Sequence, residues 1–244
     1  MIVYVSVQCG VGKEQCEDTV LAGDTLVCAG NAELSLPLYG AVCIADGVGG
    51  NAGGQFASSF VTTRIKNFTA SNPVINEAKL KQELEGINAA LIYEGNRNGF
   101  STTATTLSGI VYSNEKIYLV HIGNTRVYVM QGNYLKQLTT DHTVFNRLLK
   151  MGRIDDASKC SKNEITNCFG GGKAILLDSI SVSEIQEFST LLLTSDGVHD
   201  YIGTDELEHL LTVGTCGTNA CQSIVQAAFE AGSKDDISAV IIKK

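Results

Sequence analysis

The sequence predicts a layered α+β domain, and three observations lead to this fold class. Strand-like segments come in three clusters rather than in strict alternation with helices. Within the second cluster, the short turns SNE, GN and QGN separate the strands, as in antiparallel hairpins. Apolar residues at helical spacing fall between the clusters. Because the chain has only two prolines and no low-complexity linker, we expect its 244 residues to form a single domain.

The elements follow one another in a definite order. The first strand cluster is predicted at 2–7, 19–29 and 38–45. The second covers 103–112, 116–122, 125–130 and 133–138, and the third covers 175–182, 188–194 and 236–242. Helices are predicted at 54–68 and 76–94, with shorter ones around 145–149, 207–211 and 224–229. Three of these helices end near Gly95, Gly152 and Gly232, because glycine readily adopts the left-handed conformation of a helix C-terminus.

Composition and charge exclude several functional classes. The net charge of −8 and the lack of a basic cluster argue against nucleic-acid binding. No segment reaches the roughly 18 apolar residues of a membrane span, and the start of the chain lacks the features of a signal peptide. The eight cysteines are scattered without a CxxC pair, and Cys28 and Cys43 lie in apolar runs. We therefore expect buried, reduced cysteines in a cytoplasmic protein, which we expect to be a monomer.

Acidic residues recur where predicted strands begin or end. An apolar run leads into Asp46-Gly-Val, and another leads into Asp196-Gly-Val. Two further acid pairs stand directly before strands, at 17–18 and 235–236. If these strand ends meet at one rim of the sheets, the result is a pocket of carboxylate oxygens, with the carbonyl of Gly47 beside them.

Such a pocket needs cations, because carboxylates at close range repel one another. Ligands that are all oxygen favour the hard ions Mg²⁺ and Mn²⁺, and the ligand spacing of an EF-hand calcium loop is absent. Two such ions activate water at neutral pH and neutralise a phosphoryl group under attack, which indicates phosphoester hydrolysis. A single Asp-Gly at a strand end is commonly just a turn, so the prediction rests on the recurrence.

From about Val5 to Ile242 the chain resembles the metal-dependent serine/threonine protein phosphatases of the PP2C type (the PPM family), especially the short bacterial members. In that family an arginine precedes Glu-Asp by four residues, and Lys13, Glu17 and Asp18 hold these places here. The DGxGG motif corresponds to 46–50 and the TSDG motif to 194–197. The remaining correspondences are STTATTL, GNTR at 123–126, LTTDH at 138–142, and the closing Asp235-Asp236.

The resemblance implies a fold and a set of roles. The fold would be a four-layer α-β-β-α sandwich of two antiparallel sheets flanked by helices, with a flap at about 141–180 that includes the glycines at 170–172. Asp46 would bridge two Mn²⁺ or Mg²⁺ ions and the carbonyl of Gly47 would bind one of them. The second ion would be held by Asp196 and Asp235. The expected water-holding residues are Glu17 and Asp18, and the expected phosphate-binding residue is Lys13.

Several positions depart from the family pattern. Lys13 replaces an arginine and loses its planar fork, so we expect weaker substrate binding. Asn124 replaces an acid that helps to hold a third metal in bacterial relatives, so we expect that site to be weak or empty. Neither Val48 nor Asn51 provides the histidine that some relatives carry, which leaves a metal-bound water as the proton donor. Asp236 replaces an asparagine and is expected to keep an oxygen ligand nearby.

The four histidines, at 121, 142, 199 and 209, are expected to be structural rather than catalytic.

The leading hypothesis is a phosphatase that hydrolyses phosphoserine and phosphothreonine in proteins by direct attack of a metal-activated water. Its partners would be phosphorylated proteins, the products of a cognate serine/threonine kinase. The chain contains neither a Cys-x5-Arg loop nor a GxxxxGK[ST] phosphate loop. Two alternatives stay open: a pseudophosphatase that binds partners without turnover, and a narrow regulatory phosphatase with a single target.

Overall fold

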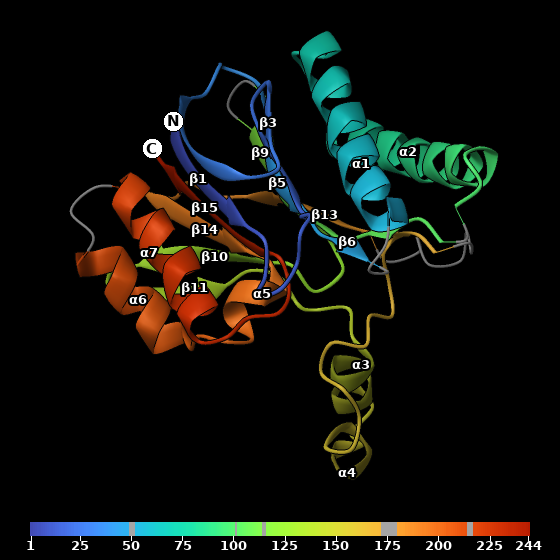
Figure 1. Ribbon diagram of the computed structural model, residues 1–244. Helices are drawn as coiled ribbons and strands as arrows, with labels where there is room; N and C mark the ends of the chain where they lie inside the picture. Colours follow the sequence, from blue (N-terminus) through green and yellow to red (C-terminus); the bar gives the residue numbers. More distant parts are fainter. Residues whose placement is uncertain (49–51, 101, 114–115, 172–179, 214–216) are drawn as a thin grey trace.

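The computed structural model describes residues 1–48, 52–100, 102–113, 116–171, 180–213 and 217–244. Two six-stranded antiparallel sheets form its centre (Figure 1). The first sheet has the strand order β11 (Tyr134–Gln137), β10 (Arg126–Gln131), β14 (Thr190–Thr194), β15 (Ile237–Lys243), β1 (Ile2–Gln8), β4 (Gly30–Ser35). The second has the order β13 (Ser181–Ile185), β9 (Lys116–Ile122), β8 (Leu107–Ser113), β5 (Gly40–Ala45), β2 (Thr19–Ala22), β3 (Thr25–Val27).

Helices cover the outer face of each sheet. The long helices α1 (Ala52–Ser71) and α2 (Glu77–Arg97) lie on the second sheet, and α6 (Thr204–Val213) and α7 (Gly217–Glu230) lie on the first (Figure 1). At the start of α2 the side chain of Asn76 accepts a hydrogen bond from the Lys79 N–H, which satisfies one of the free donors of the first turn. The predicted four-layer α-β-β-α sandwich is therefore confirmed.

Side-chain alternation along the central strands explains the layers. Every residue of β5 is buried. Ala41 and Cys43 pack in the cluster under α1 and α2, whereas Val42 and Ile44 pack in the cluster between the two sheets. Successive side chains of a strand point to opposite faces, so a strand covered on both faces is apolar throughout. This is why the run AVCIA carries the chain through the centre of the molecule to Asp46.

The predicted elements differ from the observed ones in a few places. The segment 19–29 contains two strands, β2 and β3, because Gly23 turns the chain between them with a φ of 65°. The edge strand β4 was not predicted, since most of its residues are polar or exposed. The expectation of a buried Cys28 was wrong, because its side chain is exposed. All seven cysteines that the structure describes are free.

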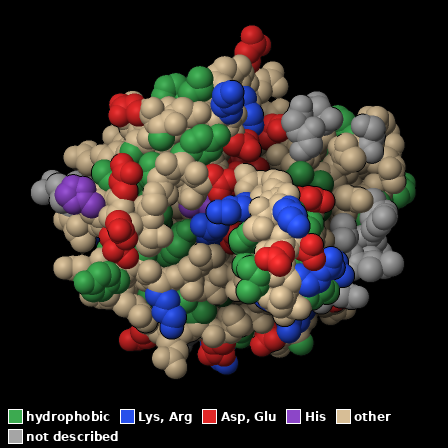
Figure 2. All heavy atoms as spheres, turned by 90° about the horizontal axis from the view of Figure 1, so that it is seen from below, with side chains coloured by type: hydrophobic (Ala, Val, Ile, Leu, Met, Phe, Trp, Pro, Cys, Tyr) green, Lys and Arg blue, Asp and Glu red, His purple; other side chains and the backbone are tan. Residues whose placement is uncertain are grey.

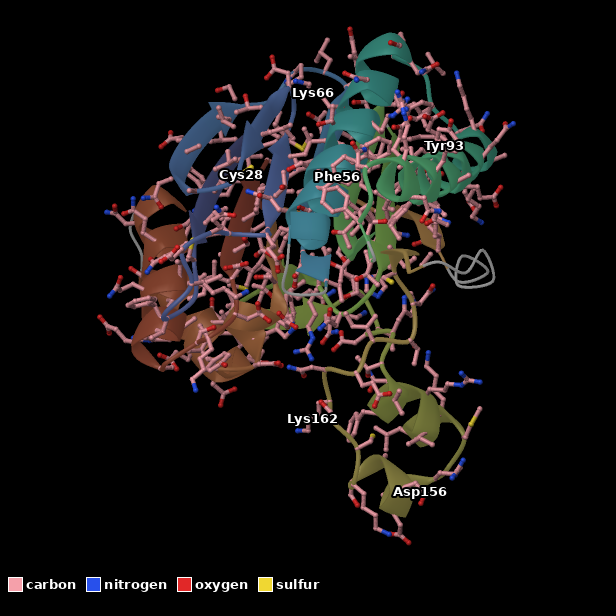
Figure 3. The ribbon with its side chains drawn as sticks, turned by 45° about the vertical axis from the view of Figure 1, so that its right-hand side comes forward. Cys28, Phe56, Lys66, Tyr93, Asp156 and Lys162 are labelled. Atoms are coloured by element: carbon pink, nitrogen blue, oxygen red, sulfur yellow. The ribbon has the colours of Figure 1, made fainter. Side chains whose placement is uncertain are left out.

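Short elements also lie outside the two large sheets and the long helices. The strands β6 (Gly47–Val48), β7 (Ala104–Thr105) and β12 (Phe169–Gly170) form a small third sheet. The helices α3 (Val144–Lys150) and α4 (Ile154–Ala157) form a lobe that projects from the body (Figure 1). Asp156 lies at the far end of this lobe and Lys162 lies on the segment that returns from it (Figure 3). The lobe falls within the segment predicted as a flap, of which 172–179 lie outside the described residues.

None of the helices in the described ranges is long and apolar enough to cross a lipid bilayer.

Candidate metal centre

Acidic residues from both sheets converge at one end of the sandwich. Asp46 follows β5 and Asp18 precedes β2 in the second sheet, while Asp196 follows β14 and Asp235 stands two residues before β15 in the first. The carboxyl groups of Asp46 and Asp196 lie within hydrogen-bonding reach of each other. The charge of Asp235 acts on both of them, and the charge of Asp18 acts on Asp46. The predicted convergence of distant acids therefore occurs in the structure.

The threonine-rich segment after α2 holds the backbone of Asp46. The Asp46 N–H donates to Thr106 Oγ1 over 3.1 Å. Its carbonyl accepts from the Thr106 N–H at 2.9 Å and from Thr105 Oγ1 at 2.9 Å. Thr106 Oγ1 also contacts the hydroxyl of Thr125. Both backbone groups of Asp46 are thereby satisfied, and its side chain is left to face the other acids.

Asp196 stands at the first position of α5 (Asp196–His199), where the chain leaves β14. Its Oδ2 accepts from Asn124 Nδ2 over 2.7 Å, and its Oδ1 has no partner among the described residues. Next to it, a Cβ on Gly197 would lie 2.1 Å from the carbonyl oxygen of Asp236. Only glycine allows this approach of α5 to the start of β15, which explains the Asp-Gly pair at this strand end.

Asp18 is fully buried beside the same acids. Its Oδ2 accepts from Ser238 Oγ over 2.6 Å, while its Oδ1 has no partner in the part of the chain that the structure describes. Burial, opposed by the Ser238 hydrogen bond and reinforced by the charge of Asp236, raises the pKa of Asp18 to about 8. Burial and the charge of Asp235 raise the pKa of Asp196 to about 6.

Asp46 follows the same trend, because burial and then the charges of Asp18 and Asp196 raise its pKa well above the usual value of an aspartate. Asp18, Asp46 and Asp196, which we call the acid cluster, form no ion pair with a cationic side chain among the described residues. Burying carboxylates without a counter-charge is costly. The unpartnered Oδ1 atoms of Asp18 and Asp196 and the all-oxygen donor set fit hard divalent cations such as Mn²⁺ or Mg²⁺.

Gly47 and Glu17 lie at the edge of the acid cluster. A Cβ on Gly47 would lie 2.6 Å from the carbonyl of Gly54 and 2.9 Å from Glu17 Cβ. The chain therefore needs glycine at position 47, where the start of α1 packs against β6. Glu17 is half-buried, and its carboxylate lies beside Gly54. The rest of the glycine motif, 49–51, lies outside the described residues.

Lys13 lies in the loop between β1 and β2 and contacts both acids that precede β15. Its Nζ is 2.6 Å from Asp235 Oδ1 and 3.1 Å from Asp236 Oδ2. Partial burial favours the neutral amine, but the hydrogen bonds and charges of Asp235 and Asp236 outweigh it and raise the pKa of Lys13. The structure thus brings the predicted phosphate-binding residue to the site, where it is paired with a predicted metal ligand.

Asp236 turns toward the same loop. Its carboxylate accepts from the Glu17 N–H over 2.8 Å and, weakly, from the Gly10 N–H over 3.4 Å, in addition to Lys13. Its oxygens therefore hold the loop between β1 and β2, and its charge acts on Asp18.

A polar cavity of about 170 Å³ lies at the base of the α3–α4 lobe, beside Asn124, the residue that donates to Asp196. Its lining includes Asn124, Lys162, and Arg126 with its partner Asp141. Arg126 Nε lies 3.0 Å from both oxygens of Asp141, and its Nη2 lies 2.6 Å from Oδ2. On the face from which the lobe projects, acidic and basic side chains are interspersed (Figure 2). The motifs GNTR and LTTDH were seen in the sequence, but this ion pair was not predicted from them.

Three histidines are engaged in hydrogen bonds within the fold. His121 lies 2.8 Å from Ser108 Oγ and 2.9 Å from the Thr140 carbonyl, and His142 Nδ1 accepts from the Gly123 N–H over 3.1 Å. Burial lowers the pKa of His121, and burial with the neighbouring His121 lowers that of His142 to about 4. His199 Nδ1 lies 2.8 Å from Thr194 Oγ1, and burial lowers its pKa as well. His209 is exposed on α6.

The chain is similar to known phosphatases along most of its length. The family model of Protein phosphatase 2C matches residues 35–230. Serine/threonine phosphatase stp of Listeria welshimeri is 25% identical over 212 residues, which cover 83% of this chain and 84% of that protein. Protein phosphatase PhpP of Streptococcus pneumoniae is 28% identical over 209 residues, with 82% and 84% covered.

Solved structures of such enzymes share the fold. The serine/threonine phosphatase PstP/Ppp of Mycobacterium tuberculosis superimposes with a TM-score of 0.81 at 23% identity, covering 99% of this chain and 98% of that one. The catalytic domain of PstP in complex with two manganese ions gives a TM-score of 0.79 at 22% identity, with the same coverage.

Proposed function

The chain belongs to the protein phosphatase 2C family, and from this premise we propose how its own residues carry out metal-dependent hydrolysis of phosphoserine and phosphothreonine in proteins. The enzyme is a serine/threonine protein phosphatase. We propose that it takes two Mn²⁺ or Mg²⁺ ions per site. When bound, these ions supply an activated water at neutral pH and neutralise charge on the phosphoryl group.

The observation that carries the proposal is the acid cluster with its unpartnered oxygens. We assign Asp46, the carbonyl of Gly47, Asp196 and Asp235 as the groups that would hold the two ions. Glu17 and Asp18 are assigned to hold water. The unpartnered Oδ1 atoms of Asp18 and Asp196 support this assignment, because a buried carboxylate oxygen without a donor requires a cation or water.

Lys13 is assigned to bind the substrate phosphate. In the structure its ammonium is paired with Asp235, which we also assign to the metal site, and Nζ lies 2.6 Å from Oδ1. If Asp235 were committed to a cation, Lys13 would lose this partner and its ammonium would be free to turn toward an incoming phosphate. A lysine offers a point charge without the two-pronged geometry of arginine, so its grip on the phosphate is weaker.

Asn124 is expected to leave a third metal site weak or empty. Its Nδ2 donates to Asp196 Oδ2, so the amide N–H, rather than an oxygen, faces this carboxylate. The amide Oδ1 is buried and has no partner among the described residues. A neutral amide beside one carboxylate is a poorer cation ligand than two carboxylates.

We further propose that residues 1–244 act as one catalytic domain and as a cytoplasmic monomer. Its targets would be phosphoproteins and not nucleic acids, with the lobe of α3 and α4 serving as a flap beside the site. The interspersed charges on the lobe face support the exclusion of nucleic acid on that side (Figure 2).

The test is hydrolysis of a chromogenic phosphate ester and of a phosphothreonine peptide. We expect turnover with Mn²⁺, none with excess chelator, and none for Asp196→Asn. Turnover that persists in chelator, or in Asp196→Asn, would contradict the assignment. A Mn²⁺-loaded protein that binds phosphopeptides without any turnover would support the pseudophosphatase instead, for which the replacements at Lys13 and Asn124 are the motivation.

A further inference from the structure

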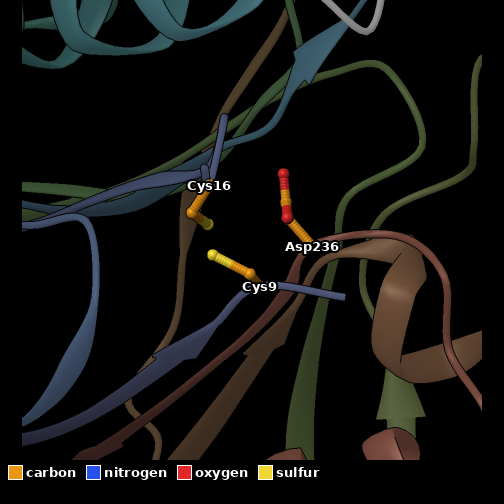
Figure 4. A group of neighbouring side chains, drawn as sticks. All are labelled: Cys9, Cys16 and Asp236. Atoms are coloured by element: carbon orange, nitrogen blue, oxygen red, sulfur yellow. The ribbon is translucent and has the colours of Figure 1, made fainter. Parts of the chain in front are cut away.

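Two thiols and a carboxylate meet beside Lys13, outside the acid cluster. Cys9 directly follows β1, Cys16 lies just before β2, and Asp236 directly precedes β15. One potential ligand atom from each of the three side chains lies within 4.8 Å of the other two. The two sulfur atoms point toward one another, and the carboxylate stands beside them (Figure 4).

Backbone contacts, rather than flexible side chains, bring these residues together. The Val11 N–H donates to the Ser233 carbonyl over 2.7 Å, which holds the loop between β1 and β2 against the segment before β15. A Cβ on Gly10 would lie 2.3 Å from the carbonyl of Asp235, so the two backbones are in direct contact. The Glu17 N–H fixes the Asp236 carboxylate from the other side.

The donor set differs in kind from that of the acid cluster. Thiolates select thiophilic ions such as Zn²⁺ and Cd²⁺, whereas carboxylates and carbonyls select Mg²⁺ and Mn²⁺. A tetrahedral zinc ion holds its sulfur and oxygen ligands roughly 3.3–3.8 Å from one another. Side chains already within 4.8 Å reach this spacing by small rotations. Cys9 is partly exposed, which gives an ion and a fourth ligand from water a route of entry.

We propose that Cys9, Cys16 and Asp236 form a binding site for a thiophilic divalent cation of the zinc and cadmium type, with water as the fourth ligand. Oδ1 of Asp236 is the available oxygen, because the one hydrogen bond that it accepts among the described residues, from the Gly10 N–H, is long at 3.4 Å. Lys13 contacts the other oxygen of Asp236 at 3.1 Å. The site therefore shares one carboxylate with the lysine that we assign to the substrate phosphate.

Binding is coupled to proton release. A thiol binds a metal ion as the thiolate, so the thiol proton leaves when the ion binds. The ion must displace that proton, and its affinity therefore rises with pH.

The experiment is a Cd²⁺ titration of the reduced full chain in oxygen-free buffer, with the acid cluster saturated by Mg²⁺. The readout is the ultraviolet charge-transfer band of cadmium thiolate, which carboxylate ligands do not produce. We expect a band that saturates at one ion per chain. Cys9→Ser and Cys16→Ser should each weaken binding by at least about 10-fold. Cys28→Ser and Cys160→Ser, which alter thiols outside the site, should leave the titration unchanged.

Asp236→Asn tests the oxygen ligand without removing a thiol. The amide oxygen can still accept from the Glu17 N–H, so we expect a folded protein with about 10-fold weaker Cd²⁺ binding. If Cys16→Ser fails to fold, the less buried Cys9→Ser decides the question. No thiolate band at equimolar Cd²⁺, or a band of the same affinity in Cys9→Ser, would overturn the proposal.

Discussion

Asp46 and Asp141 are buried to the same degree, each with 8% of its surface exposed, yet their surroundings are opposite. Asp141 receives a two-pronged ion pair from Arg126, with contacts of 2.6 and 3.0 Å. Asp46 faces Asp18 and Asp196, and these charges together with burial raise its pKa. Asp141 is thus neutralised by the chain. Asp46 needs a counter-charge from outside, and this difference separates a structural acid from a proposed metal ligand.

Removal of the charge of Asp46 is expected to have the largest effect on activity. We expect Asp46→Asn to lower kcat by about 1000-fold, since a group that stabilises the transition state electrostatically contributes on this scale. The measurement is steady-state hydrolysis of a phosphothreonine peptide at saturating Mn²⁺. Asp205→Asn, on the exposed start of α6, is the matched control and should leave kcat unchanged. A decrease of less than about 10-fold in Asp46→Asn would contradict the assignment.

Removal of the positive charge beside Asp141 tests the role of this aspartate as a structural acid. Arg126→Ala leaves the buried Asp141 without its cation, so we expect the free energy of unfolding to fall by about 3 kcal/mol. This loss should be the same with and without Mn²⁺, as measured by urea unfolding. Arg97→Ala removes an exposed ion pair with Glu94 and should cost less than about 1 kcal/mol. A loss for Arg126→Ala that appears only with Mn²⁺ would show that the pair belongs to the metal site.

The pH dependence of stability should separate the two regions as well. The pKa of Asp18 is raised to about 8 and that of Asp196 to about 6, so the folded metal-free protein binds more protons than the unfolded chain above pH 4. Its stability is therefore expected to fall as pH rises from about 4 to 8.

The measurement is the urea midpoint of the metal-free protein across this range. Saturating Mn²⁺ should reverse the trend, because the ion favours the ionised carboxylates. Asp18→Asn should flatten it in the absence of metal. A metal-free protein that becomes more stable between pH 5 and 8 would contradict the raised pKa values.

The smallest expected effect concerns Lys13. Lys13→Arg restores the planar fork for phosphate, so we expect KM for a phosphopeptide to fall a few-fold, with little change in kcat. This change corresponds to a gain of roughly 1 kcal/mol in the free energy of substrate binding. Lys81→Arg, on the exposed face of α2, serves as the control. Unchanged kinetics in Lys13→Arg would argue that this side chain does not contact the phosphate.

Much of the site was predictable because it follows from short sequence patterns. Asp46 and Asp196 each stand between an apolar run and a glycine. Because the apolar runs predict strands, both acids are predicted at strand ends, at the rim of the sheets. The partners of these acids were not predictable in the same manner. Ser238 on Asp18 and Asn124 on Asp196 are 220 and 72 residues away in sequence, and only the fold brings them into contact.

The same limit applies to the fold. Strands covered on both faces, such as β5, carry a strong apolar signal, whereas the polar edge strand β4 carries little. Lys13 was predicted as a phosphate ligand, but its present pairing with Asp235 and Asp236 depends on how one loop packs against a distant turn. Such packing is not encoded in the spacing of the motif.

The most direct test of the acid cluster is calorimetric titration of the metal-free protein with Mn²⁺ near pH 7. We predict two ions bound per chain with release of protons, because carboxyl groups of raised pKa must ionise on binding, and we predict loss of this binding in Asp46→Asn. Mn²⁺ binding that is absent in the wild type, or unchanged in Asp46→Asn, would contradict the account.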